Sequence, residues 1–221
     1  MGENITLTCK DGVKISAFVA KPEGQPKGGM VVLQEIFGVN HHIRAVAERY
    51  AAQGYLAIAP GMFDRVGPGI ELGYEAPDRA KGSEIRAKVD ESKAVLDIEA
   101  AVESAKQAGK VGVVGFCWGG TLAYLAALKI DGIAAAVGYY GGGIAAMADQ
   151  KPKVPTMLHF GDQDQSIPLA SVDKVKAAQP DIPVYVYRAG HGFSCDERGS
   201  FDKTASDQAR DRTLEFFAKH I

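Results

Sequence analysis

A cysteine flanked by glycines stands where a buried strand is expected to turn into a helix. The apolar run Val111–Val114 leads directly into GFCWGG at residues 115–120, and helical spacing follows over Thr121–Leu128. This is the G-x-nucleophile-x-G arrangement, with cysteine where serine usually stands. Small residues allow so sharp a turn, and the N-terminus of the next helix offers N–H groups to a developing oxyanion. We interpret Cys117 as a nucleophile.

Two other interpretations of this segment remain open from the motif alone. A buried structural cysteine beside glycines that close a loop is common in proteins. A phosphate-binding loop is the second alternative, but its G-x-G-x-x-G fingerprint has a first spacing that this turn lacks.

An acid and a histidine follow the cysteine in the chain order of α/β-hydrolases. After the apolar run Thr156–Phe160 come Asp162 and Asp164, and we expect Asp164 to be the orienting acid, with Asp162 shaping the turn. His191 lies between two glycines just after the apolar run Val184–Tyr187. A general base at this place reaches a nucleophile that follows a nearby strand. The order of the three residues favours a catalytic triad.

A glutamate follows the first predicted parallel strand, from which hydrolases of this kind supply an oxyanion-hole N–H. We predict the N–H groups of Ile36 and Trp118 as the two donors. Glu35 would face the nucleophile and raise the pKa of the Cys117 thiol, because like charges resist joint ionisation. The resting thiol would then stay protonated and protected from oxidation until substrate moves Glu35 away. A glutamate in a surface loop is the alternative.

The remaining histidines show no metal-type spacing. His41 and His42 are adjacent at a predicted helix start and would not share a helix face, and His191-x3-Cys195 offers too few ligands for a site. We expect no metal and no cofactor.

The elements that position these residues alternate between strands and helices. An antiparallel hairpin is predicted around Asp11-Gly12. Its strands and the buried runs that follow are Ile5–Cys9, Val13–Ala20, Met30–Leu33, Tyr55–Ala59, Val111–Val114, Ile133–Val137, Thr156–Phe160 and Val184–Tyr187. Besides a helix around Val46–Tyr50 and the one after Cys117, the predicted helices are a long one from an N-cap at Ser83 to Gly109, Leu169–Ala178 and Thr204–Lys219. We predict one α/β domain over residues 1–221, with a mostly parallel sheet covered on both faces.

The composition excludes several classes of protein. The chain has 221 residues, of which 46% are hydrophobic and 24% charged, as is usual for a soluble globular protein. With 25 Lys and Arg against 27 Asp and Glu, the charge balance argues against nucleic-acid binding. The sequence has no apolar stretch that approaches a membrane span and no secretory signal. An odd number of scattered cysteines favours a reducing, cytoplasmic compartment. Many of the 26 glycines lie at turns after predicted strands.

With these residues in view, the chain resembles the dienelactone hydrolase family. The matching segments are QEIFG at 34–38, GFCWGG at 115–120, GYYG at 138–141, GxxD at 161–164 and HGF at 191–193. The resemblance implies an α/β-hydrolase fold, a triad of Cys117, His191 and Asp164, and a Glu35 that holds the resting thiol. It also implies opening of a dienelactone through an acyl-cysteine to maleylacetate, and places Phe37 and Tyr140 in the pocket.

The resemblance is weaker at the arginines that hold the substrate carboxylate in dienelactone-type members. One family arginine lies four residues after the histidine, where this chain has Cys195. The other precedes the long helix in an Arg-then-Tyr-and-Trp context, which neither Arg79 nor Arg86 has. We take Arg86 and Arg198 as the candidate substrate-binding arginines.

The expected partner is therefore a small ester or lactone, bound by a monomer or weak homodimer, with no nucleic acid and no membrane involved. A general carboxylesterase or thioesterase of the same family, and a noncatalytic binding protein on the hydrolase fold, are the alternatives.

Overall fold

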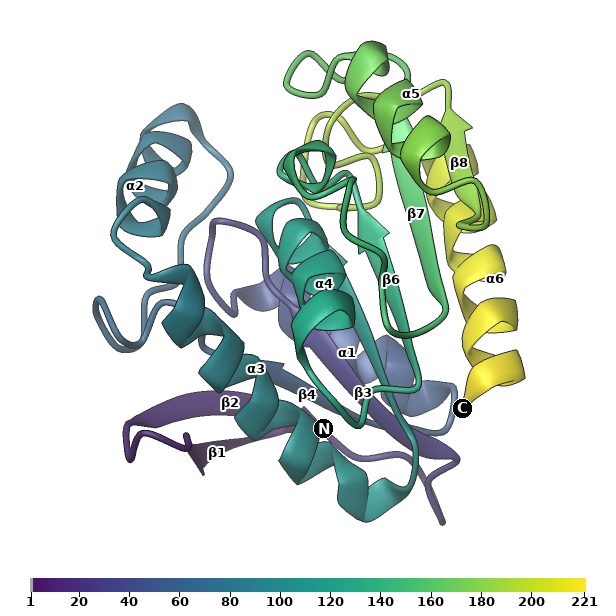
Figure 1. Ribbon diagram of the computed structural model, residues 1–221. Helices are drawn as coiled ribbons and strands as arrows, with labels where there is room; N and C mark the ends of the chain where they lie inside the picture. Colours follow the sequence, from purple (N-terminus) through teal and green to yellow (C-terminus); the bar gives the residue numbers. More distant parts are fainter. Residues whose placement is uncertain (1) are drawn as a thin grey trace.

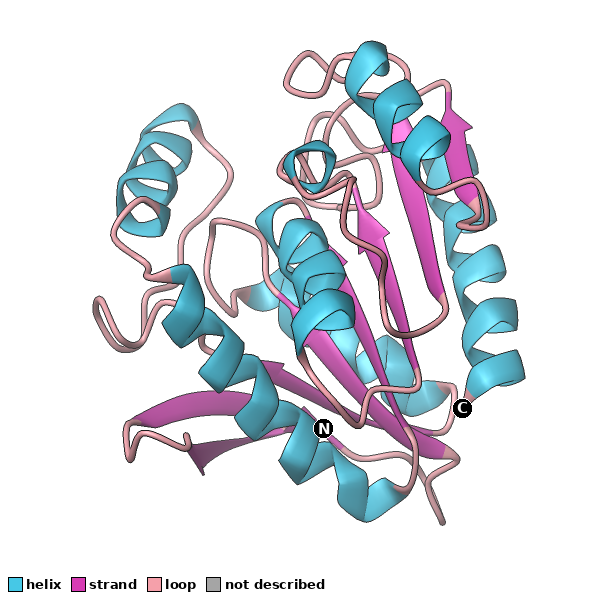
Figure 2. Ribbon diagram, viewed as in Figure 1, coloured by secondary structure: helices cyan, strands magenta, loops and turns pink. Residues whose placement is uncertain are grey.

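The computed structural model describes residues 2–221, in which one twisted sheet forms the centre of the molecule (Figures 1 and 2). Its strands are β1 (Glu3–Thr8), β2 (Lys14–Ala20), β3 (Gly28–Leu33), β4 (Tyr55–Pro60), β5 (Val111–Phe116), β6 (Ala135–Tyr139), β7 (Thr156–Gly161) and β8 (Val184–Tyr187). They lie in the order β1-β2-β4-β3-β5-β6-β7-β8. The strands from β3 to β8 are parallel, and β1 and β2 are antiparallel at one edge. The predicted mostly parallel α/β architecture is confirmed.

Helices cover both faces of this sheet. They are α1 (His41–Ala52), α2 (Ala76–Arg86), α3 (Glu91–Ala105), α4 (Trp118–Lys129), α5 (Leu169–Ala178) and α6 (Lys203–His220), with short 3-10 turns η1 (Lys106–Ala108) and η2 (Ile144–Ala146). In Figure 1, α3, α4 and α5 lie in front of the sheet, whereas α1 and α6 pack behind it against β4 and β6–β7 respectively. The short α2 stands apart from the sheet.

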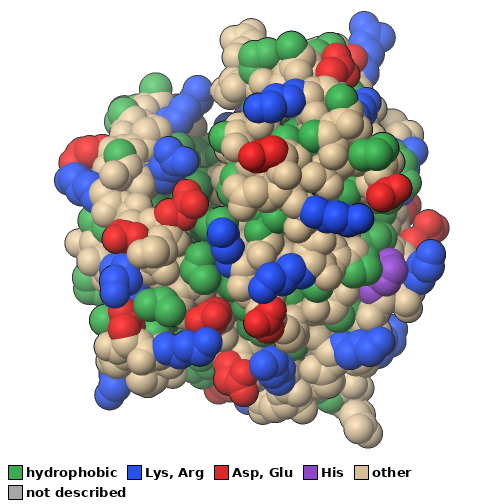
Figure 3. Space-filling model, in the orientation of Figure 1, with side chains coloured by type: hydrophobic (Ala, Val, Ile, Leu, Met, Phe, Trp, Pro, Cys, Tyr) green, Lys and Arg blue, Asp and Glu red, His purple; other side chains and the backbone are tan. Residues whose placement is uncertain are grey.

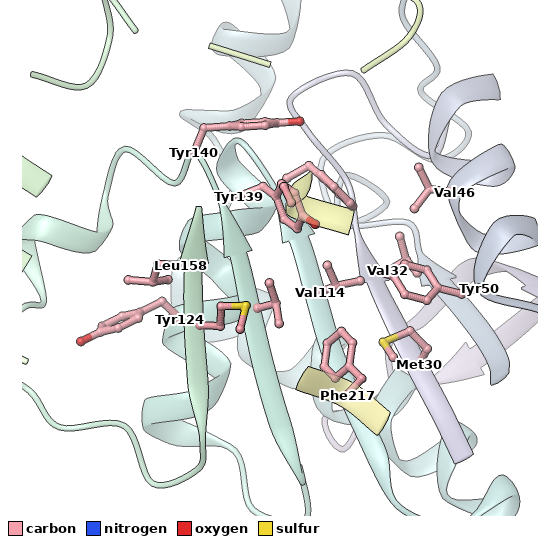
Figure 4. Packing of buried hydrophobic residues seen from close by; sticks show 14 of the residues in the cluster. Met30, Val32, Val46, Tyr50, Val114, Tyr124, Tyr139, Tyr140, Leu158 and Phe217 are labelled. Carbon is pink, nitrogen blue, oxygen red and sulfur yellow. The ribbon is translucent and has the colours of Figure 1, made fainter. Parts of the chain in front are cut away.

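The parallel strands from β3 to β7 are buried on both faces, as expected for strands between two helical layers. Every residue of β3 and β5 is buried. In Figure 4, Met30 and Val32 of β3 lie among Val46 and Tyr50 of α1 and Phe217 of α6. This packing fixes the sheet rigidly, so the loops at its carboxyl edge start from well-defined positions.

The long helix predicted from Ser83 is wrong in its start. The structure has two helices there, and Ser83 lies inside the first, α2, which begins with a capping box between Glu75 and Asp78. The second, α3, begins after Asp90, whose side chain accepts a hydrogen bond from the backbone N–H of Ser92. The backbone therefore breaks between residues 86 and 91, and α2 can turn away from the sheet.

The parallel arrangement brings the predicted chemistry to one edge of the sheet. The carboxyl ends of β3, β5, β7 and β8 lie at the same edge of the sheet. The segments that follow these strands contain Glu35, Cys117, Asp164 and His191 respectively. Residues 35 and 191, more than 150 positions apart in the sequence, are thus delivered to one place.

The surface is mixed in charge. Lys and Arg side chains alternate with Asp and Glu over the face seen in Figure 3. Among the helices of residues 2–221, none combines the length and the apolar character needed to cross a bilayer.

Candidate active site

The backbone at Cys117 forms the sharp turn that the sequence predicted. Cys117 has φ = 56°, a left-handed conformation unusual for a residue with a side chain. It lies between the last residue of β5 and the first residue of α4. A Cβ on Gly115 would lie 1.9 Å from the carbonyl oxygen of Gly119, and a Cβ on Gly119 would lie 2.3 Å from that of Leu33. Both positions require glycine because neighbouring backbone fills the space.

Cys117, His191 and Asp164 form a continuous chain of contacts. The sulfur of Cys117 lies 3.1 Å from Nε2 of His191, and Nδ1 of His191 lies 2.7 Å from Oδ2 of Asp164. Asp164 is buried, and its other oxygen accepts the backbone N–H groups of Ser166 at 2.8 Å and Ile167 at 3.1 Å. These donors hold the carboxylate in one orientation, so the imidazole is fixed between acid and thiol.

The environment of His191 favours its charged form. Burial lowers the pKa of His191, but the hydrogen bonds to Asp164 and Cys117 outweigh burial and raise the pKa to about 10. The hydroxyl of Ser200 donates to the His191 carbonyl at 2.7 Å, which fixes the loop behind the ring. A cationic imidazole at neutral pH stabilises a thiolate beside it.

The two predicted oxyanion donors line the same pocket as the sulfur. Ile36 follows the end of β3 by three residues, and Trp118 is the first residue of α4. Within residues 2–221 neither backbone N–H donates a hydrogen bond to the protein. Unpaired N–H groups at a helix start are suited to a developing negative charge.

Glu35 occupies a different place in the contact network from the one expected. Its Oε1 accepts a 2.8 Å hydrogen bond from Nη1 of Arg198, and the thiol of Cys117 pairs with His191 instead. The second oxygen of Glu35 is buried and has no partner among the described residues. Glu35 is therefore the counter-ion of Arg198, and its influence on the resting thiol stays a prediction.

Arg198 reaches Glu35 from the loop after His191. The resemblance described above would place an arginine in this loop at residue 195 instead. Its guanidinium packs over the rings of Phe37 at 5.7 Å and Tyr74 at 5.9 Å. Gly192 makes room, since a Cβ there would lie 2.4 Å from Nη1 of Arg198. Cys195 is fully buried.

These residues surround a pocket of about 840 Å³. Of the residues singled out from the sequence, its lining includes Ile36, Phe37, Arg86, Cys117, Trp118, His191 and Arg198. Asp164 and Glu35 do not line the pocket. Asp164 contacts the lining residue His191, and Glu35 contacts the lining residue Arg198. Tyr140 is outside the lining: it is fully buried, with its ring 5.2 Å from that of His191. Tyr140 therefore packs against the histidine in this structure, and its expected role in substrate binding stays a prediction.

One face of α2 supplies pocket residues that the sequence did not predict as a set. Arg79, Ser83 and Arg86 all line the pocket, and their spacing of four and three places them on one helix face. Neither arginine has an ion pair among residues 2–221, whereas Glu84 of the same helix pairs with Lys81 and Lys88. Predicting α2 as a helix of its own would have revealed this face.

Comparison with known proteins decides the family. The family model described as "Dienelactone hydrolase family" matches residues 15–221. The chain is 34% identical to the carboxymethylenebutenolidases of Pseudomonas putida and Pseudomonas knackmussii, over 98% of this chain and 96% of each relative. The chain belongs to the dienelactone hydrolase family. It is an enzyme that hydrolyses ester or lactone bonds.

Solved structures agree with this membership. A crystal structure of a protein from Klebsiella pneumoniae, provisionally named a dienelactone hydrolase, superposes with a TM-score of 0.88 at 28% identity, over 99% of this chain and 98% of that chain. A dienelactone hydrolase-like promiscuous phosphotriesterase from metagenomic libraries shares the fold, with a TM-score of 0.79 at 20% identity and coverage of 99% and 98%. The hydrolase thus has the α/β-hydrolase fold of its family, as predicted.

Proposed function

We propose that this hydrolase opens small anionic lactones or esters through an acyl-cysteine on Cys117, and that a carboxymethylene-butenolide opened to maleylacetate is the best candidate substrate. The observation that carries the proposal is the unbroken chain from the Cys117 sulfur through His191 to Asp164, at 3.1 Å and 2.7 Å. It is a nucleophile, a base and an orienting acid in the order that acyl transfer requires.

In the first step the Cys117 thiolate attacks the lactone carbonyl carbon. The carbonyl oxygen becomes an oxyanion that the N–H groups of Ile36 and Trp118 receive. Collapse of this intermediate breaks the ring C–O bond and leaves an acyl-cysteine, while the enol oxygen takes the proton from His191.

In the second step water hydrolyses the thioester. His191, now neutral, takes a proton from the water as its oxygen attacks the acyl carbon, and Asp164 stabilises the imidazolium that forms. The thiolate leaves, so Cys117 and His191 return to their starting charges. The released enol becomes a ketone, and the net reaction consumes one water per lactone.

The charges of the pocket support an anionic substrate. Its lining contains Arg79, Arg86 and Arg198 and, among the described residues, no Asp or Glu. This excess is local, because the whole chain has a net charge of −2. Glu35 neutralises Arg198, so Arg79 and Arg86 are left for a carboxylate, and a substrate that displaces Glu35 would gain the third.

Turnover of a chromogenic dienelactone and of a neutral aryl ester tests this function. We expect wild-type enzyme to prefer the dienelactone and Cys117→Ala to lose both activities. We expect Arg86→Gln to raise KM for the dienelactone about tenfold, since a charged hydrogen bond to a carboxylate contributes roughly 1.5–3 kcal/mol, and to leave the aryl ester unchanged. The matched control is Lys88→Gln, because Lys88 follows the end of α2 and does not line this pocket.

The outcomes separate the alternatives. Activity that survives in Cys117→Ala would contradict the triad. Turnover of the aryl ester alone, indifferent to Arg86→Gln, would identify a general esterase, and failure of any activated ester to acylate Cys117 would favour a noncatalytic binding protein.

A further inference from the structure

Two histidines and two carboxylates meet outside the pocket that contains Cys117. His41 and His42 are the first two residues of α1, and Asp196 and Glu197 lie in the loop between β8 and α6. Nδ1 of His42 lies 3.0 Å from Oδ1 of Asp196, and Nδ1 of His41 contacts Oε1 of Glu197. One ligand atom from each of His42, Asp196 and Glu197 lies within 4.8 Å of the other two.

The separation of His42 and Asp196 is close to that of two ligands around one tetrahedral ion, and a ligand atom of Glu197 lies within 4.8 Å of both. An ion with bonds of about 2.0–2.2 Å to imidazole nitrogen and carboxylate oxygen holds its ligand atoms roughly 3.3–3.6 Å apart. The 3.0 Å separation between His42 and Asp196 needs only a small outward movement. Imidazole with carboxylate is a ligand set that suits zinc and its neighbours in the periodic table.

The surroundings orient these side chains toward one another. The side chain of His42 is fully buried, and its Nε2 has no partner within residues 2–221, so its polar contact is on the Nδ1 side. Oδ2 of Asp196 contacts the guanidinium of Arg49, which leaves Oδ1 facing His42. An outer hydrogen bond of this kind fixes the orientation of a ligand carboxylate.

The charges decide which residues the site depends on. Arg49 and the positive N-terminal end of α1 oppose a cation here, so one carboxylate is too little. Asp196 and Glu197 together outweigh Arg49. The exposed His41 does not share a helix face with His42, but it already contacts Glu197, so it is the candidate for a second imidazole.

The sequence alone predicted no metal, but from this cluster we propose that His42, Asp196 and Glu197, completed by His41, bind a divalent transition-metal ion of the zinc type. The bound ion ties the start of α1 to the loop that also carries His191 and Arg198. It therefore stabilises that loop and does not take part in the reaction.

Zinc binding measured by competition with a chromogenic chelator tests the proposal. Cys117 and His191 also attract zinc, so the measurement uses the Cys117→Ala protein as its reference. We expect one ion per chain and, with zinc at 100 times its Kd, a rise in Tm of about 5–10 °C. Adding Glu197→Gln or His41→Ala should weaken binding at least about tenfold and remove most of the rise.

The matched control is Glu215→Gln, an exposed carboxylate on α6. Binding and the Tm rise should be unchanged in this variant. Two outcomes would overturn the proposal. One is that the Cys117→Ala protein binds no zinc at concentrations up to about 1 mM, so that any Kd is millimolar or weaker. The other is that the Glu197→Gln and His41→Ala variants bind zinc as tightly as the control does.

Discussion

Cys9 and Cys117 each place their sulfur 3.1 Å from a titratable partner, but the partners differ. Cys9 donates to Oδ1 of Asp97, a buried carboxylate that Arg65 also contacts. Burial first, and then the hydrogen bond and charge of Asp97, raise the pKa of Cys9 to about 12. Cys117 faces the imidazole of His191 instead. The comparison teaches that burial and the partner together, rather than the thiol itself, decide whether a cysteine is held as a thiol or faces a base.

Cys195 extends the comparison within the same loop as His191. It is fully buried, and burial followed by the charge of Glu35 raises its pKa to about 12. Two of the three cysteines are therefore held as thiols, which leaves Cys117 as the candidate nucleophile.

The largest expected effect comes from replacing Cys117 and Cys9 by alanine in separate variants. Cys117→Ala should lower kcat by about 10⁴-fold or more, because the acyl-enzyme can no longer form. Cys9→Ala should leave kcat near that of wild type and cost about 1–2 kcal/mol of unfolding free energy, measured in urea. Comparable losses of kcat in both variants would show that the two thiols are not distinguished by their partners.

Removing the acid should make Cys117 behave more like Cys9. Asp164→Asn withdraws the carboxylate that helps raise the pKa of His191, so the imidazolium is no longer favoured beside the thiol. We expect kcat to fall about 10³–10⁴-fold and alkylation of Cys117 by iodoacetamide to slow at pH 7. Asp162→Asn, in the same loop, is the control, and equal losses in the two variants would reject Asp164 as the orienting acid.

Glu35→Gln sharpens the comparison by removing the carboxylate that pairs with Arg198 while keeping the shape of the side chain. Without that charge, and with Arg198 released from its ion pair, a thiolate at Cys117 is easier to form. Alkylation at pH 6 should accelerate about threefold. The exposed Glu23→Gln should have no effect, and an unchanged pH profile in Glu35→Gln would mean that Glu35 does not influence the sulfur.

The smallest effect is on stability. Because the folded pKa of His191 is raised from 6.5 to about 10, its contribution to stability is fully present below pH 6.5 and is lost as the pH rises to about 10. The difference in Tm between wild type and His191→Gln should therefore shrink between pH 7 and pH 10. A difference that stays constant over this range would contradict a charged histidine.

Local patterns in the sequence were enough for the strands and for the order of Cys117, Asp164 and His191, because each sits where a short buried run meets a glycine-rich turn. The pairing of Glu35 with Arg198 was not predictable in this way, since it depends on the path of the loop after His191 and joins residues 163 positions apart. The break between α2 and α3 had a local signal at Asp90 and Ser92, but the apolar spacing downstream dominated the interpretation. The single domain and the cytoplasmic compartment stay predictions.

The position of α2 away from the sheet has an evolutionary consequence. Only Gly82 and Ile85 of this helix are buried, so most of its residues, including Arg79 and Arg86, can be exchanged with little effect on folding. Because Arg79 and Arg86 line the pocket, we expect substitutions there to change substrate preference while the nucleophile turn stays intact. We therefore expect the family's sequences to diverge slowly at the nucleophile turn and quickly in α2. For selecting a new substrate specificity in the laboratory, α2 is the segment to vary first.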